Sequence, residues 1–208
     1  MRNFKAKIGA EVKAIAIPTT WTELTVKQFQ ALALANVLNE ELEVLTGVPA
    51  ASWKKYFDST TVSKARPIIE AMGFLRIPPN LDGKPIPPEL YLMGRIVKPI
   101  KDVETMPVHG FQNILSSIQG KRPEDFIQMM HTLAGHGLAH SWNRGDDSES
   151  LAEALAKEIL NKPVVEYYPV ASFFCFAVQK SAQSGQQPSL VRKIQKLKRK
   201  LLRQEPIA

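Results

Sequence analysis

IPTTWTELTVKQFQAL, residues 17–32, contains the clearest helix start in the sequence. Thr25 is a favoured N-cap residue, and Gln28 follows it at the spacing of a capping box, in which each side chain satisfies a backbone N–H of the other. Trp21 and Leu24 lie just before the cap, where apolar side chains can pack on the first turn of the helix. We therefore expect a helix that begins at Val26.

This first helix is predicted to run from Val26 to about Leu38. Val26, Phe29, Ala33 and Val37 recur at helical spacing and mark one apolar face. The segment 31–35 is apolar all round, which indicates a helix covered on more than one side.

Further helices follow from apolar periodicity and from the positions of glycine and proline. Gly47 suits the left-handed position after a helix, and Pro49 prevents the helix from continuing. Residues 1–16 alternate lysine with aliphatic residues and are expected to form one short arm or edge strand. The predicted helices are Glu40–Thr46, Val62–Met72, His109–Ile118, Pro123–Leu133, Ser148–Leu160 and Pro163–Ser181, and Ala50–Phe57 is expected to form one helical turn.

Seven prolines between residues 74 and 107 exclude long helices from that part of the chain. Leu90–Met93 and Arg95–Lys98 have the composition of short strands on either side of Gly94. The predicted fold class is therefore mainly α, a helical bundle with a small β-rich, proline-rich insertion around residues 74–105.

The predicted organisation is one helical core, 1–182, with the insertion at 74–107, a polar linker at 183–188 and a terminal helix at 189–208. The chain has 208 residues and a net charge of +7. Six of these seven charges come from residues 189–208, so the rest of the chain is nearly neutral.

The basic C-terminal helix is the most function-like feature of the sequence. Its aliphatic residues follow the a/d spacing of a coiled coil, and two heptads are too short to be stable without a partner. Three interpretations stay open: a solvated terminal helix, a helix that docks on a protein partner, and a helix that contacts nucleic-acid phosphates. The candidate partner-binding residues are Leu190, Ile194, Leu197, Leu201, Arg192, Lys193, Lys196, Lys198, Arg199, Lys200 and Arg203.

Three histidines, His131, His136 and His140, are the main candidate metal ligands. His136 and His140 have the i, i+4 spacing that can place two imidazoles on one metal ion. However, the glycines at 135 and 137 are expected to break the helix there, and no acid or cysteine stands beside them. We therefore predict surface or helix-end histidines and no metal site.

Two other candidates have structural explanations. Asp147 or Ser148 suits the N-cap of the following helix, where the neighbouring acids complement its positive end. Cys175 lies in a phenylalanine-rich helical run without a visible base, so a buried, unreactive thiol is expected.

The sequence contains no Gly-rich phosphate loop, nucleophile elbow or paired-carboxylate motif. We therefore predict a protein that is not an enzyme and has no cofactor. No run approaches the roughly 18 apolar residues of a membrane span, so no membrane partner is predicted. The single cysteine suits a reducing compartment.

The pattern Pro-x-x-Trp-x-Glu-Leu-Thr-x-x-Gln-Phe, which begins at Pro18, resembles small proteins of tailed phages that infect Bacteroidota. The Phe173-Phe174 helix and the basic C-terminus are also similar. The resemblance is strongest from Trp21 to Pro49. It implies a tail-assembly, head–tail connector or other minor structural component, and it implies no catalytic residue.

The expected function is thus that of a non-enzymatic phage structural or assembly component in the connector, neck or tail region. Its expected partners are other phage structural proteins, and it is expected to form a homo-oligomer or to occur in many copies in an assembly. Nucleic acid is the alternative partner, through the C-terminal helix. The expected location is the virion, or the host cytoplasm during assembly. A further alternative for the function is a tail-assembly chaperone that is absent from the virion.

Overall fold

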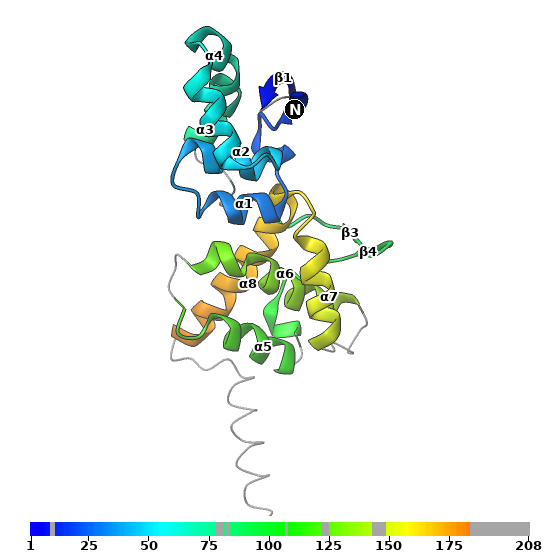
Figure 1. The fold of residues 1–208 in the computed structure, drawn as a ribbon. Coiled ribbons are helices and arrows are strands. Elements are labelled where there is room, and N and C mark those ends of the chain that lie inside the picture. Colours follow the sequence, from blue (N-terminus) through cyan, green and yellow to red (C-terminus); the bar gives the residue numbers. More distant parts are fainter. Residues whose placement is uncertain are drawn as a thin grey trace, which may run out of the picture. The chain divides into compact units, whose positions relative to one another are not determined.

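The computed structural model describes residues 1–8, 11–77, 81, 84–106, 108–121, 125–142 and 149–183. This part of the chain is mainly α-helical, as predicted, with two small two-stranded sheets (Figure 1). The elements are β1 (Arg2–Ile8), β2 (Glu11–Ile17), η1 (Trp21–Glu23), α1 (Val26–Leu32), α2 (Leu38–Thr46), α3 (Ala50–Ser59), α4 (Val62–Ala71), η2 (Met72–Arg76), β3 (Leu90–Leu92), β4 (Arg95–Val97), η3 (Val103–Thr105), α5 (Val108–Ile118), α6 (Phe126–Trp142), α7 (Glu149–Ile159) and α8 (Val164–Gln183), where η denotes a 3-10 helix.

The contacts within the chain define two compact units. The first comprises Met1–Lys84 together with Leu160–Tyr167, and the second comprises Pro85–Ile159 and the chain from Tyr168 onward. The first unit is therefore discontinuous in sequence. Helix α8 contributes its first turn to the first unit and the rest of its length to the second.

The capping box predicted at the start of α1 is present. The Gln28 backbone N–H donates to the Thr25 hydroxyl at 3.2 Å, and the Thr25 N–H donates to the Gln28 side-chain oxygen at 3.1 Å. Trp21 packs edge-on against Phe29, with ring centroids 5.9 Å apart, and Leu24 is buried. These contacts fix the direction from which the chain enters α1.

A distant segment satisfies the two remaining N–H groups at the start of α1. The Val26 N–H donates to the Lys162 carbonyl at 2.9 Å, and the Lys27 N–H donates to the Leu160 carbonyl at 2.8 Å. The first N–H groups of a helix have no partner inside the helix, so they require acceptors from elsewhere. The segment 160–162 supplies them and thereby closes the first unit.

Helix α1 is shorter than predicted and ends at Leu32. Leu34 and Val37, which the sequence placed on covered faces, are 66% and 53% exposed. The Asn36 backbone N–H donates to the Glu40 carboxylate at 2.8 Å, so the chain turns here and enters α2. Local apolar composition alone did not reveal this turn.

The N-terminal segment forms two strands, where the sequence analysis expected one. β1 and β2 pair antiparallel from Arg2 opposite Ile17 to Ile8 opposite Glu11. The face that carries Ala6, Ile8 and Ile15 is buried, and the opposite face carries lysines. The alternation of lysine and aliphatic residues thus continues through both strands.

Helix α6 continues through Gly135 and Gly137, so the predicted break at these glycines is wrong. A Cβ atom at position 135 would lie 2.9 Å from the Ala156 Cβ and 2.7 Å from the Ala152 carbonyl oxygen of α7. One at position 137 would overlap the ring of Phe174. The glycines are therefore required for close packing inside the second unit.

The two short strands predicted around Gly94 are present as β3 and β4. Met93 and Gly94 form the two-residue turn between them, with φ values of 45° and 76°. Positive φ at both positions is typical of the tight turns that suit twisted hairpins. Glycine adopts this conformation freely, whereas methionine rarely does.

Several expectations concern residues outside the part of the chain that the structure describes. They include the linker beyond Gln183, the basic C-terminal helix and the proposed caps Asp147 and Ser148. In the described residues, no helix is long and apolar enough to cross a bilayer.

Candidate functional site

The three histidines all lie on α6 and are half-buried; His140 lies in the last turn of the helix, and His131 and His136 lie in its interior. Burial lowers the pKa of His131, and a hydrogen bond with the backbone of Gln128 partly opposes this change. In the described ranges, no three His, Cys, Asp or Glu side chains gather where they could hold a metal ion.

Cys175 is buried in α8, as predicted. Burial raises the pKa of its thiol, because a thiolate would lose its hydration in an apolar environment. This environment favours the neutral thiol, which is the less reactive form.

The eleven candidate residues of the basic C-terminal helix, from Leu190 to Arg203, lie outside the described residues. Two other surfaces on the described residues have the character of binding sites, one in each unit.

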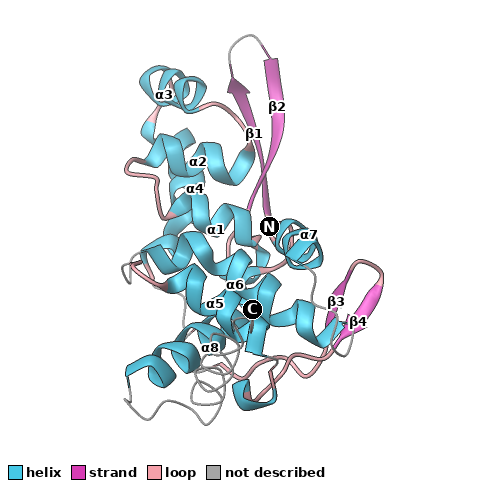
Figure 2. Cartoon of the chain, turned by 90° about the horizontal axis from the view of Figure 1, so that it is seen from below, coloured by secondary structure: helices cyan, strands magenta, loops and turns pink. Residues whose placement is uncertain are grey.

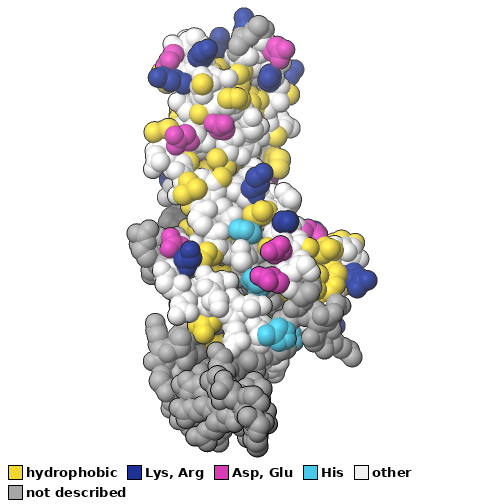
Figure 3. All heavy atoms as spheres, turned by 60° about the horizontal axis from the view of Figure 1, so that its bottom comes forward, with side chains coloured by type: hydrophobic (Ala, Val, Ile, Leu, Met, Phe, Trp, Pro, Cys, Tyr) yellow, Lys and Arg dark blue, Asp and Glu magenta, His cyan; other side chains and the backbone are white. Residues whose placement is uncertain are grey.

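The first surface is the outward face of the β3–β4 hairpin, formed by Tyr91, Met93 and Ile96. Tyr91 and Ile96 lie directly opposite each other in the sheet and are 61% and 63% exposed, and Met93 at the turn is 48% exposed. Figure 3 shows a group of hydrophobic side chains at the right-hand edge of the molecule. The hairpin lies on the same side in Figure 1, because the rotation between the two views is about the horizontal axis. We call this surface the hairpin face.

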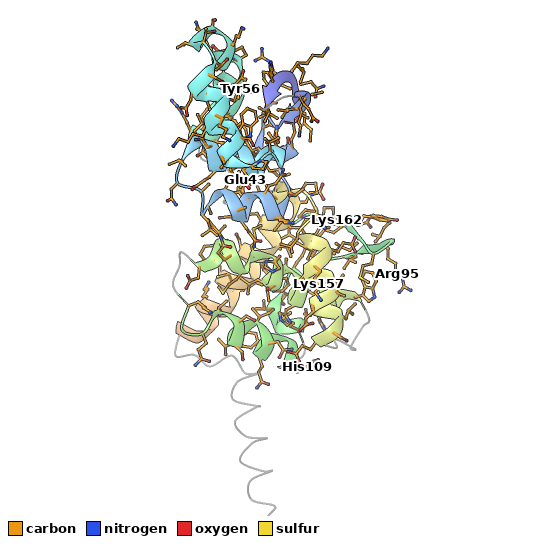
Figure 4. All side chains as sticks on the ribbon, in the orientation of Figure 1. Glu43, Tyr56, Arg95, His109, Lys157 and Lys162 are labelled. Atoms are coloured by element: carbon orange, nitrogen blue, oxygen red, sulfur yellow. The ribbon has the colours of Figure 1, made fainter. Side chains whose placement is uncertain are left out.

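The other side of the hairpin is anchored in the second unit. Leu90, Leu92 and Val97 are buried. At the turn, the Met93 N–H donates to the Glu158 carboxylate of α7 at 2.7 Å. Near the turn, the guanidinium of Arg95, labelled in Figure 4, lies 5.4 Å from the ring centroid of Trp142 on α6. The exposed apolar residues thus lie on a hairpin that is held in place by contacts with α6 and α7.

The second surface is a groove of about 870 Å³ in the first unit, between the β1–β2 hairpin and helices α3 and α4. Its lining includes four lysines and three hydroxyl side chains, and it includes no acidic residue. We call it the lysine groove. It is lined by Phe4, Lys5, Ala6, Lys7, Val12, Lys55, Tyr56, Ser59, Thr60, Lys64, Pro67 and Ile68.

Sequence reasoning missed the lysine groove, because the chain outside the C-terminal helix is nearly neutral overall. The four lysines come from β1, α3 and α4, and only the fold brings them together. The alternation of Lys5 and Lys7 was visible in the sequence, but its relation to Lys55 and Lys64 depends on long-range packing.

No protein family matches the chain, and neither a curated protein nor a solved structure is significantly similar to it.

Proposed function

We propose that the protein is a non-enzymatic structural or assembly component of a tailed bacteriophage, in the head–tail connector, neck or tail region, and that it acts through protein–protein contacts. The observation that carries this proposal is the hairpin face. Tyr91 and Ile96 remain exposed on a hairpin whose other side is held by buried side chains and by Glu158.

An exposed apolar group on a rigid support is a common feature of protein interaction surfaces. Aromatic residues and methionine are enriched at interfaces, and an aromatic side chain buries a large area at a small cost in side-chain entropy. The partner is another structural subunit of the same assembly. The resemblance of the Pro18–Phe29 stretch to phage proteins supports a phage particle as that assembly.

The test is quantitative mass spectrometry of purified particles of the phage that encodes this chain. We expect the chain in a fixed number of copies per particle. Replacing Tyr91 and Ile96 with serine should remove it from particles while the purified variant keeps its helical circular dichroism. Particles that contain an undiminished amount of the double variant would contradict the role of the hairpin face.

Presence in infected cells together with absence from particles would favour the assembly-chaperone alternative. The nucleic-acid alternative depends on the basic C-terminal helix and is tested by salt titration of DNA binding. A steep loss of affinity with salt that disappears when residues 189–208 are deleted would favour it.

A further inference from the structure

The lysine groove contains unpaired positive charge. Lys5, Lys7, Lys55 and Lys64 are all exposed, and none makes an ion pair with any residue that the structure describes. In contrast, Lys13 pairs with Glu11 at 3.7 Å in the same unit. Four cations around one concave surface whose lining contains no acid favour an anionic ligand.

One wall of the groove is the open edge of β1. Lys5 and Lys7 lie on one face of this strand, and Phe4 and Ala6 lie on the other, yet all four line the groove. Residues from both faces of a strand can line the same groove only if the edge of the strand is turned toward that groove. Figure 2 shows β1 as the strand of the hairpin nearer to α3, and β1 pairs with β2 alone.

The opposite wall comes from α3 and α4. Lys55, Tyr56 and Lys64 lie on this side, with Pro67 and Ile68 as apolar lining (Figure 4 labels Tyr56). The groove volume of about 870 Å³ lies in the range of pockets that enclose a ligand, about 300–1,000 Å³. The groove therefore combines a strand edge, positive charge and an apolar lining.

We infer that the lysine groove binds an extended, acidic segment of a partner protein, which adds to the edge of β1 as a third strand. An open strand edge offers backbone N–H and C=O groups that another strand can pair with. A peptide strand can pair with both the N–H and the C=O groups of the edge and also contact the lysines, whereas phosphate groups can only accept hydrogen bonds and leave the C=O groups without donors.

The side-chain order of β1 specifies the pattern of this segment. Residues that lie opposite each other in adjacent strands interact on the same face of the sheet, and opposite charges there are favourable. The segment should therefore place Asp or Glu beside Lys5 and Lys7, and apolar residues on the face of Phe4 and Ala6. This is an alternation of acidic and apolar residues.

The same lysines disfavour pairing of β1 with strand edges that also carry positive charge. Lysine on an edge strand prevents pairing with another edge of the same kind, because like charges would face each other. A second copy of β1 would bring two further lysines into the groove. The surface belongs to the first unit, and this inference does not depend on the proposed function of the hairpin face.

The test measures fluorescence anisotropy of the full chain with a short labelled peptide that alternates glutamate and valine. We expect saturable binding of this peptide, and binding about tenfold weaker or worse for a peptide with the same residues in two separate blocks. Hydrogen exchange of the β1 amides should slow on binding. A labelled oligothymidine is the third probe.

Charge reversal provides the matched variants. Lys55→Glu, and the double variant Lys5→Glu with Lys7→Glu, should each weaken peptide binding about tenfold or more. Lys54→Glu makes the same charge change on the neighbouring residue of α3, which does not line the groove, and should leave the affinity unchanged.

Four results would overturn the inference. These are absence of binding by the alternating peptide, equal affinity for the block peptide, equal weakening by Lys54→Glu, and binding without slower exchange in β1. Tighter binding of oligothymidine than of the peptide, lost in the Lys55→Glu variant, would assign the groove to nucleic acid instead.

Discussion

At the scale of single residues, two glycines of α6 allow the second unit to pack closely. Gly135 lies against Ala152 and Ala156 of α7, and Gly137 lies against the ring of Phe174. Each glycine costs conformational entropy within a helix, about 1 kcal/mol relative to alanine. The close approach of the neighbouring elements offsets this cost.

We expect Gly137→Ala to lower the free energy of unfolding by about 3 kcal/mol, because the new methyl group would overlap the Phe174 ring. Chemical denaturation measures this change. Adding Phe174→Leu should recover part of the loss, so the double variant should be more stable than the sum of the single effects predicts. Simple additivity would contradict the proposed contact.

Met93 adopts a conformation that methionine disfavours. Its φ of 45° is in the left-handed region, which costs about 1–2 kcal/mol for most residues and less for asparagine. We therefore expect Met93→Asn to raise the free energy of unfolding by about 1 kcal/mol while reducing incorporation into particles, because the side chain belongs to the hairpin face.

Gly94→Ala is the matched change in the same turn and should have the opposite effect on stability, since φ is 76° there. If both variants lowered the melting temperature equally, the left-handed geometry of Met93 would be wrong.

His131 makes the stability of the protein depend on pH. Its pKa is lowered in the folded state by burial, so the unfolded chain binds the proton more tightly. Its contribution to stability is complete above the unfolded pKa of about 6.5 and is lost as the pH falls through the lower folded pKa. His131→Gln should therefore flatten the loss of stability as the pH falls below about 6.5, measured by urea denaturation. His109→Gln, at an exposed position of α5, controls for the loss of one imidazole; an equal flattening in that variant would argue against burial as the cause.

At the scale of elements, the start of α1 depends on a segment far away in the sequence. Thr25 satisfies one N–H group of the first turn, and the carbonyls of Leu160 and Lys162 satisfy the two before it. The capping box was predictable from residue type and spacing. The two distant carbonyls were not, because a backbone acceptor leaves no mark in the sequence.

Proline is normally tolerated in the first turn of a helix. We expect Lys27→Pro to be an exception, because it removes the N–H that donates to Leu160 and leaves that carbonyl without its donor. The variant should be about 2 kcal/mol less stable than Ala51→Pro, the same change at the same position of α3. Equal melting temperatures of the two variants would show that the bond to Leu160 contributes little.

The predictable parts of the fold were those fixed by short-range patterns. The left-handed Gly47, the helix over 62–71 and the strands around Gly94 all follow from neighbouring residues. The errors arose where distant contacts decide the outcome. Gly135 and Gly137 indicate a helix break in isolation, and only α7 and Phe174 explain why the helix continues. The lysine groove was missed for the same reason.

At the scale of the whole molecule, the first unit is built from two parts of the chain, Met1–Lys84 and Leu160–Tyr167. Pro163 lies in a β-bridge with Thr25, and the Val164 N–H donates to the Leu24 carbonyl at 2.9 Å. The second part therefore contributes backbone contacts at the start of α1, beside a buried leucine.

Dividing the chain after Lys84 tests this dependence. We expect the fragment 1–84 alone to lack a cooperative thermal transition by circular dichroism, because it lacks residues 160–167. The two fragments expressed together should copurify and recover the transition. A fragment 1–84 extended through a flexible linker by residues 160–167 should also recover it. Cooperative unfolding of 1–84 by itself, at the temperature of the intact chain, would show that the second part is dispensable.

The discontinuity of the first unit has a consequence for synthesis on the ribosome. Residues 1–84 emerge early, but the carbonyls of Leu160 and Lys162 that complete the start of α1 emerge only after residues 85–159 have been made. At translation rates of about 5–20 residues per second, this delay is about 4–15 s. During that time the N–H groups of Val26 and Lys27 lack their acceptors, so the first unit is incomplete, and a holdase that binds unfinished chains would act in this interval.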